Sequence, residues 1–294
     1  MCRFCDALKG HHTTPPAVDP ATASHRWSSR RGFVLAAAGT ALTSATPGLA
    51  QVDVGKASSL RKLVPAEKLE SAAVQQYRQM LSEARAQGAL APENHPQLLR
   101  LRQIARALIP YTTPWNDRAR GWQWEVNLIG SKQVNAFCMP GGKIAFYTGI
   151  LDQLKLDGDE SAMIMGHEMA HALREHARER LAKTQATSLG LSIGAQLLGL
   201  GDLGNVAANL GTQLLSLKFS REDETEADLV GLELAARAGF EPEASVSLWQ
   251  KMSANGGGSG PGFLSTHPTG PDRIRDLQAN VPKVQGLYQQ SQRR

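Results

Sequence analysis

Residues 160–183 read ESAMIMGHEMAHALREHARERLAK and form an unbroken helical pattern with HExxH at its centre. A spacing of four places His167 and His171 one turn apart on one helix face, where both imidazoles can reach one metal ion. Glu168 is then positioned to accept a proton from an attacking water. His176, five residues after His171, falls off this face, so we expect a structural role for it. The stretch therefore predicts a helix that carries a metal-dependent hydrolytic site.

A third metal ligand must come from elsewhere in the chain. A metzincin would have glycine and histidine where this chain has Arg174 and Ala177, so that class is excluded. The best candidate is the run SREDETEAD at 220–228, which opens another helical pattern. Glu224 and Asp228 lie one turn apart, so one carboxylate can bind the metal while the other orients a ligand imidazole. Taken alone, the run is better explained as a solvated helix N-terminus whose acidic groups complement the helix dipole.

Taken together, HExxH and the 220–228 run resemble the motifs of the gluzincin metallopeptidases of family forty-eight. This family contains the CAAX prenyl protease, HtpX and quality-control relatives. The resemblance implies one zinc ion per chain, held by His167, His171 and Glu224. It also implies that Asp228 supports a ligand histidine from behind and that Glu168 is the catalytic base.

Two further segments extend the resemblance. Residues 135–142, NAFCMPGG, are similar to a family segment whose strand edge lies along the active-site cleft and pairs with an extended substrate. Residues 265–268, STHP, followed by Arg273, resemble a downstream element of the family. His267 would approach the zinc there, either as a fourth ligand in a resting state or as a donor to the developing oxyanion. The plainer readings are a β-hairpin and a capped turn. The predicted substrate-binding residues are Asn135, Ala136, Phe137, Pro140, Gly141 and Gly142.

Apolar spacing elsewhere predicts the rest of the fold. It indicates helices at 65–87 and from about 96 to 110. From residue 122 the period changes to alternation, which predicts two or three short strands at 122–128, 134–138 and 143–148. The predicted class is α+β: a mostly helical zincin-like metallopeptidase domain with a small antiparallel sheet beside the HExxH helix.

The first 50 residues have the composition of a targeting leader. Paired arginines at Arg30 and Arg31, followed by Phe33 and a weakly apolar run that ends at Ala50, resemble a twin-arginine export signal. The alternative is a buried helix that happens to follow two arginines. On the export reading, the protein is periplasmic. The predicted organisation is a leader at 1–50 and one metallopeptidase domain at 51–294, with N-terminal helices at 51–120 and a catalytic core at 121–294.

Charge and cysteine content change when the leader is set aside. The 294 residues include 32 basic and 27 acidic groups, a net charge of +5, whereas residues 51–294 carry 27 and 25, a net charge of +2. This near balance gives no basic patch, so we expect no nucleic-acid partner. Cys2 and Cys5 lie in the leader, where a zinc site with His11 and His12 is the alternative to an incidental pair. Cys138 alone remains, and one thiol cannot form an internal disulfide.

Residues 184–201 carry no charge, but their glycines and polar residues argue against a membrane-spanning helix. They predict either a lid-like helical hairpin or a surface that contacts a membrane. The loop NGGGSGPG at 255–262 cannot hold regular structure.

The motifs together predict a zinc-dependent endopeptidase that hydrolyses peptide bonds. The family implies protein or peptide substrates, in particular misfolded envelope proteins under quality control in the cell envelope. A zinc-containing chaperone or binding protein with a closed site is the alternative, because a fourth ligand at His267 would leave no open position on the metal. A membrane-embedded prenyl-protein protease would require spanning helices, so we expect the soluble, exported branch of the family.

Overall fold

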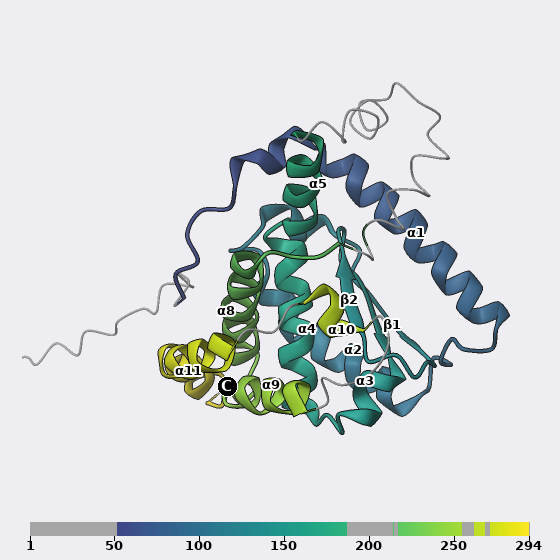
Figure 1. Cartoon of the computed structure of the whole chain (residues 1–294). Coiled ribbons are helices and arrows are strands. Elements are labelled where there is room, and N and C mark those ends of the chain that lie inside the picture. Colours follow the sequence, from purple (N-terminus) through teal and green to yellow (C-terminus); the bar gives the residue numbers. More distant parts are fainter. Residues whose placement is uncertain (1–51, 187–213, 215–216, 255–261, 268–270, 294) are drawn as a thin grey trace, which may run out of the picture. The chain divides into compact units, whose positions relative to one another are not determined.

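Helix α4 (Gly158–Leu173) lies at the centre of the fold, and its residues from Glu160 to Leu173 are all buried (Figure 1). The computed structural model describes residues 52–186, 214, 217–254, 262–267 and 271–293, which fall within one compact unit, Thr46–Arg294. Burial of every residue over nearly four turns means that other elements cover this helix on all sides. The HExxH residues are therefore carried by the most enclosed element of the described fold.

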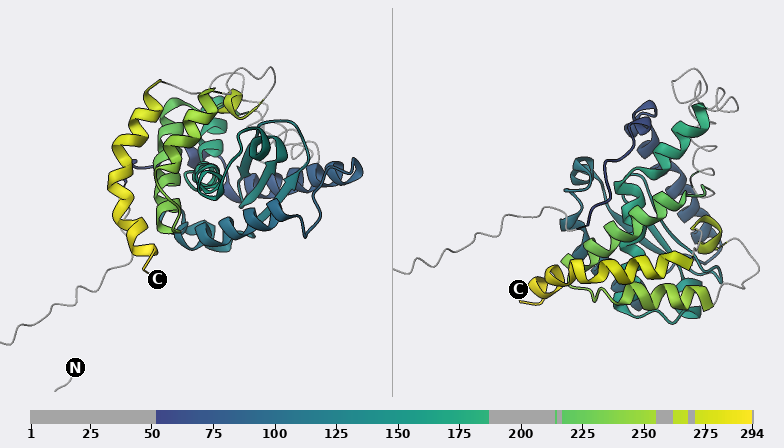
Figure 2. Two further views of the ribbon diagram at one scale, coloured as in Figure 1. Left: turned by 90° about the horizontal axis from the view of Figure 1, so that it is seen from below. Right: turned by 60° about the vertical axis from the view of Figure 1, so that its left-hand side comes forward.

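Helices and a sheet surround α4. Helices α8 (Arg221–Arg237), α2 (Pro96–Leu108) and α9 (Ala244–Ala254) contact it, as does strand β2 (Ala136–Met139). Helix α11 (Pro271–Ser291) packs on α8 and α9, and Figure 2 shows it along the outside of both. Helix α1 (Ala66–Ala86) packs through Tyr77 against the other face of the sheet. The shorter elements are η1 (Ser59–Leu63), η2 (Ile109–Tyr111), η3 (Asp117–Gly121), α3 (Thr148–Gln153), α5 (His176–Ala186) and α10 (Phe263–Thr266).

The sheet has three strands in the order β1-β3-β2, with β1 at Glu125–Ile129 and β3 at Lys143–Tyr147. The predicted α+β class is confirmed, but the sheet is mixed, since β2 pairs antiparallel and β1 pairs parallel with β3. Gly141 and Gly142, with φ values of 86° and 76°, form a tight turn that joins β2 to β3 as a hairpin. Because β2 occupies one edge of β3, β1 pairs with the other edge, and it runs parallel to β3.

The predicted unbroken helix at 160–183 is interrupted. Helix α4 ends at Leu173, whose carbonyl accepts a hydrogen bond of 2.9 Å from the Asn116 amide, and α5 starts at His176. Between them, Glu175 has a φ of 60°, a left-handed conformation that costs about 1–3 kcal/mol. The Glu175 carboxylate pairs with Arg61 at 3.1 Å and with Arg178 at 2.8 Å. Tertiary contacts therefore hold a turn that residue propensities do not indicate.

Helices α4 and α8 approach each other closely where two glycines meet. A Cβ on Gly166 would lie 2.8 Å from the carbonyl oxygen of Gly231, and a Cβ on Gly231 would lie 2.6 Å from the backbone nitrogen of His167. Each helix begins with a capping box, Asp157 with Glu160 on α4 and Ser220 with Asp223 on α8. These features fix the starts of the two helices and their separation.

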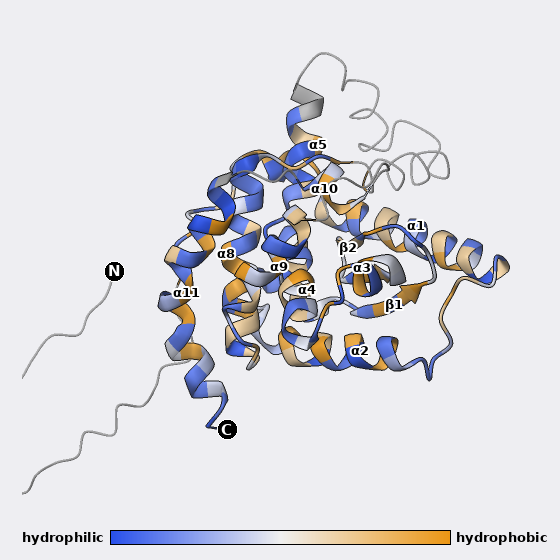
Figure 3. Ribbon diagram, turned by 60° about the horizontal axis from the view of Figure 1, so that its bottom comes forward, coloured by the Kyte–Doolittle hydropathy of each residue, from blue (hydrophilic) through white to orange (hydrophobic). Residues whose placement is uncertain are grey.

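Hydrophilic and hydrophobic residues alternate around α1, α2 and α11, as expected for helices that cover a core with one face (Figure 3). Within the described ranges, no helix combines the length and apolar character needed to cross a membrane. The predicted leader at 1–50 with Cys2 and Cys5, the charge-free segment beyond residue 186, and the loop at 255–261 lie outside the described residues.

Candidate metal centre

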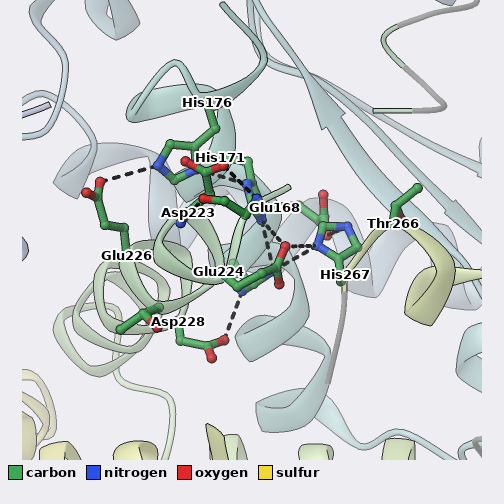
Figure 4. Close-up of polar contacts among 12 residues, drawn as sticks. Glu168, His171, His176, Asp223, Glu224, Glu226, Asp228, Thr266 and His267 are labelled. Carbon is green, nitrogen blue, oxygen red and sulfur yellow. Dashed lines mark hydrogen bonds and ion pairs between the residues drawn. The ribbon is translucent and has the colours of Figure 1, made fainter. Parts of the chain in front are cut away.

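Four buried side chains from three parts of the chain form one cluster. His167 and His171 project from α4, Glu224 from the first turn of α8, and His267 from the C-terminal end of α10. Figure 4 shows His171, Glu224 and His267 of this cluster. One ligand atom from each lies within 4.8 Å of the others. The structure thus brings together the three predicted metal ligands and the histidine whose role the motifs left open.

The donor set fits a zinc ion. His167 Nε2 and His171 Nε2 lie 3.0 Å apart, and each lies 3.5 Å from a carboxylate oxygen of Glu224. Two imidazoles and one carboxylate are a common ligand set for catalytic zinc. Glu168 Oε1 is buried and has no hydrogen bond within the described part of the chain, although His267 Nε2 lies 3.3 Å away. Its unsatisfied oxygen is consistent with a carboxylate that acts on a ligand of the cluster.

Burial and charge give the cluster residues different pKa values. Burial acts to lower the pKa of His167, but hydrogen bonds with Asp228 and Glu224 outweigh it and raise the pKa to about 9. Burial lowers the pKa of His171 well below its ordinary value. Burial also raises the pKa of Glu168. For Glu224, burial acts to raise the pKa, yet interactions with His167 and His267 hold it far below the ordinary range.

Asp228 lies behind His167. Its Oδ1 is 3.0 Å from His167 Nδ1, so the carboxylate accepts the ring proton and leaves Nε2 facing the cluster. Arg273 on α11 donates to Asp228 at 2.8 Å and lies 2.7 Å from Glu224 Oε2. Its guanidinium stacks over Trp249 at 3.4 Å from the ring centroid. Arg273 thus bridges the two carboxylates of α8 and partly balances their charge.

A cleft beside the cluster contains part of the predicted substrate-binding segment. Strand β2 and its flanking residues line it together with Glu168, His171 and His267. Asn135, Ala136, Phe137 and Pro140 line this cleft. Gly141 and Gly142 form the turn beyond it, where a Cβ on Gly142 would lie 2.8 Å from Trp124.

Sequence reasoning missed two aromatic neighbours of His171. Phe219 stacks on the His171 ring with centroids 3.9 Å apart and lines the cleft. His176 Nδ1 lies 2.9 Å from His171 Nδ1, so His176 is off the ligand face, as expected, but it contacts a predicted metal ligand from behind. The helix break at 174–175 is the reason. Phe219 directly precedes the capping residue Ser220, but nothing in the sequence indicates which side chain it covers.

A buried HExxH helix, with a carboxylate on a second helix beside it, defines a zincin-like metallopeptidase fold of the gluzincin type. The chain belongs to peptidase family M48, whose model matches residues 99–281. The family prediction is confirmed, and the matched range includes every residue of the four-residue cluster.

Three relatives illustrate the similarity. The chain is 36% identical over 199 residues to mitochondrial metalloendopeptidase OMA1 of Schizosaccharomyces pombe, covering 67% of this chain and 56% of the relative. Identity to the OMA1 of Saccharomyces cerevisiae is 31% over 217 residues, covering 70% and 62%. Metalloprotease LoiP of Escherichia coli is 26% identical over 204 residues, covering 68% and 77%. The match therefore spans little more than half the length of the two OMA1 proteins.

The comparisons contradict the predicted periplasmic localisation. The relatives with more than 30% identity cited above are named as mitochondrial enzymes. The paired arginines on which the export prediction depended lie at 30 and 31, outside the described residues. A short basic and apolar pattern is shared by several kinds of targeting segment, so it was insufficient to assign a compartment.

Proposed function

We propose that this chain is a zinc-dependent endopeptidase that cleaves protein or peptide substrates in protein quality control. One observation carries the proposal: the buried cluster of His167, His171, Glu224 and His267 opens onto a cleft that also contains Glu168. Membership in a peptidase family and the metalloendopeptidase names of the relatives support the same chemistry.

His167, His171 and Glu224 would hold the zinc. When bound, zinc would supply a Lewis acid that activates water and polarises the scissile carbonyl. Glu168 accepts a proton from the attacking water and later returns a proton to the leaving amine. Because burial raises its pKa, Glu168 holds the transferred proton more readily than an exposed glutamate would.

His267 lies between the predicted metal ligand Glu224 and the predicted base Glu168. Its Nδ1 lies 3.0 Å from Glu224 Oε1, and its Nε2 lies 3.3 Å from Glu168 Oε1. It would act either as a donor to the developing oxyanion or as a fourth ligand in a resting state.

Strand β2 would bind the substrate backbone. In the described residues, no strand pairs with its outer edge, and all four of its residues line the cleft. An extended peptide could add to this edge and pass in front of Glu168. Such main-chain recognition is tolerant of sequence and suits unfolded polypeptides. The narrower expectations, misfolded envelope proteins as substrates and contact of the region near residue 184 with a membrane surface, stay predictions.

The proposal predicts that Glu168→Gln retains zinc but loses activity. Glutamine preserves the shape of the side chain and cannot accept the proton, so turnover of an unfolded protein such as casein should fall by a factor on the order of 10²–10⁴. Zinc content, measured by mass spectrometry of the native protein, should stay at one ion per chain. Undiminished cleavage by this variant would remove Glu168 from the mechanism.

A zinc-containing chaperone or binding protein is the second candidate. The observation in its favour is that His267 belongs to the cluster, since four protein ligands would close the metal site. The same two measurements separate the candidates. One zinc per chain with no casein cleavage, in both the unmodified protein and His267→Ala, would favour the binding protein.

A further inference from the structure

His176 lies behind His171 on the side away from the metal cluster. The two Nδ1 atoms are 2.9 Å apart, and His176 Nε2 lies 3.3 Å from Glu226 Oε2 (Figure 4). Arg174 Nε donates to the same carboxylate oxygen at 2.7 Å. His171, His176 and Glu226 thus form a continuous row, and both histidines in it are buried.

The hydrogen-bond direction in this row follows from its outer end. An ionised Glu226 can only accept, and it accepts from Arg174 and from the Nε2–H of His176. A neutral His176 with its proton on Nε2 presents a lone pair on Nδ1. His171 must then donate its own Nδ1–H to that lone pair. The remaining lone pair of His171, on Nε2, faces His167 and Glu224.

The turn after α4 makes this contact possible. On an unbroken helix, a residue five positions after His171 would be rotated by about 140° from it, since each residue adds about 100°. The left-handed Glu175 ends that rotation and starts α5 in a new direction. His176, the first residue of α5, therefore returns to the ring of His171.

We propose that His176 is a positioning residue, which fixes the tautomer and orientation of His171 for metal binding and is itself held by Glu226 and Arg174. This inference rests on the proposed zinc site. The two ligand histidines would then be oriented by different groups. Asp228 supports His167 with a carboxylate, and His176 supports His171 with an imidazole. Both arrangements leave Nε2 free for the ion.

Zinc affinity of the metal-free protein tests the inference without any assay of turnover. Competition with a chromophoric chelator would give the zinc dissociation constant for the unmodified chain, His176→Leu, His176→Asn and Glu226→Gln. We expect His176→Leu to raise the constant about 10- to 100-fold, as loss of such supporting groups does elsewhere. His176→Asn retains an acceptor near the position of Nδ1 and should recover most of that loss. Glu226→Gln should weaken binding in the same direction but less.

Volume and hydrogen bonding are separated by this choice of variants. Leucine preserves the volume of the side chain, and asparagine preserves a hydrogen-bond acceptor. If His176 only fills space, His176→Asn should be less stable, and all variants should bind zinc with the same affinity as the unmodified chain. Such a result would overturn the inference. Glu222→Gln is the matched control, because Glu222 is an exposed carboxylate one turn before Glu226 on α8. Its dissociation constant should not change.

If His176→Leu does not fold, Glu226→Gln carries the test, and an unchanged constant in that variant overturns the inference. If the unmodified protein binds no zinc, the proposed function itself fails. Nitrogen-15 NMR of His171 gives a second readout, since the proton should reside on Nδ1 in the unmodified protein and in His176→Asn.

Discussion

His167 and His171 lie one turn apart, yet their surroundings move their pKa values in opposite directions. Both rings are buried, which by itself disfavours the charged imidazolium. His167 gains a hydrogen bond from its ring to Asp228, and its pKa rises to about 9, whereas burial dominates for His171. Of these two rings, His167 should therefore carry the additional proton at pH 7 in the metal-free protein, and His171 should be neutral.

Zinc uptake at pH 7 should release that proton. A ligand nitrogen needs a free lone pair, and pH 7 lies below the His167 pKa of about 9, so the ring must lose a proton when the ion binds. Isothermal titration calorimetry in buffers of different ionisation enthalpy measures the number released. Asp228→Asn removes the carboxylate that raises the pKa and should reduce proton release. Binding heats that do not depend on the buffer would contradict this assignment.

At the scale of elements, the separation of α4 and α8 sets the distance between the ligands. Gly231→Ala would place a Cβ 2.6 Å from the His167 backbone nitrogen and so push the two helices apart. We expect a loss of about 1–3 kcal/mol in the free energy of unfolding, together with weaker zinc binding. Chemical denaturation and chelator competition would measure the two effects. Gly286→Ala on α11 is the control, because its Cβ meets nothing within 4 Å.

Alanine at position 286 should instead stabilise the protein by about 0.5–1 kcal/mol, because alanine favours the helix over glycine. Zinc affinity should not change in that variant. Equal effects of the two substitutions would mean that the contact between Gly166 and Gly231 does not control the ligand geometry.

Local patterns predicted most elements, and tertiary contacts account for the differences. The amphipathic spacing of α1 and α2 and the capping residue of α8 are visible in the sequence, and these helices lie where they were predicted. The helix break at Glu175 is not visible in the sequence, since arginine and glutamate are ordinary helix residues. The turn depends instead on Asn116 and Arg61, which are distant in the chain. The prediction of an antiparallel sheet was wrong for a similar reason, because alternating polarity within a strand does not determine the order or direction of its neighbours.

For the whole molecule, the cluster joins parts of the chain that are far apart in sequence. His167 and His267 are separated by 100 residues and lie 3.3 Å apart. Their approach could be proposed from the family motifs alone, whereas the contribution of His176 required the fold. The identity of these residues and a supporting role for Asp228 could be read from the sequence, but the contact of His176 with His171 could not.

Removal of zinc should therefore destabilise the protein globally. An ion that binds only the folded chain adds about 2.7 kcal/mol at a free concentration 100 times its dissociation constant. For a chain of this size, that corresponds to a fall in melting temperature of roughly 5–10 °C on chelation. Differential scanning calorimetry with and without EDTA measures it, and addition of excess zinc should restore the original value. A melting temperature indifferent to chelator would argue that the cluster holds no ion.

The left-handed turn at Glu175 also constrains how the chain can change in length. One residue inserted or deleted between Leu173 and His176 would rotate the start of α5 by about 100° and carry the second imidazole away from His171. The interval from HExxH to the next histidine is therefore a marker that can be read in any related sequence: relatives with a different interval should lack this imidazole pair and support the equivalent ligand by other means.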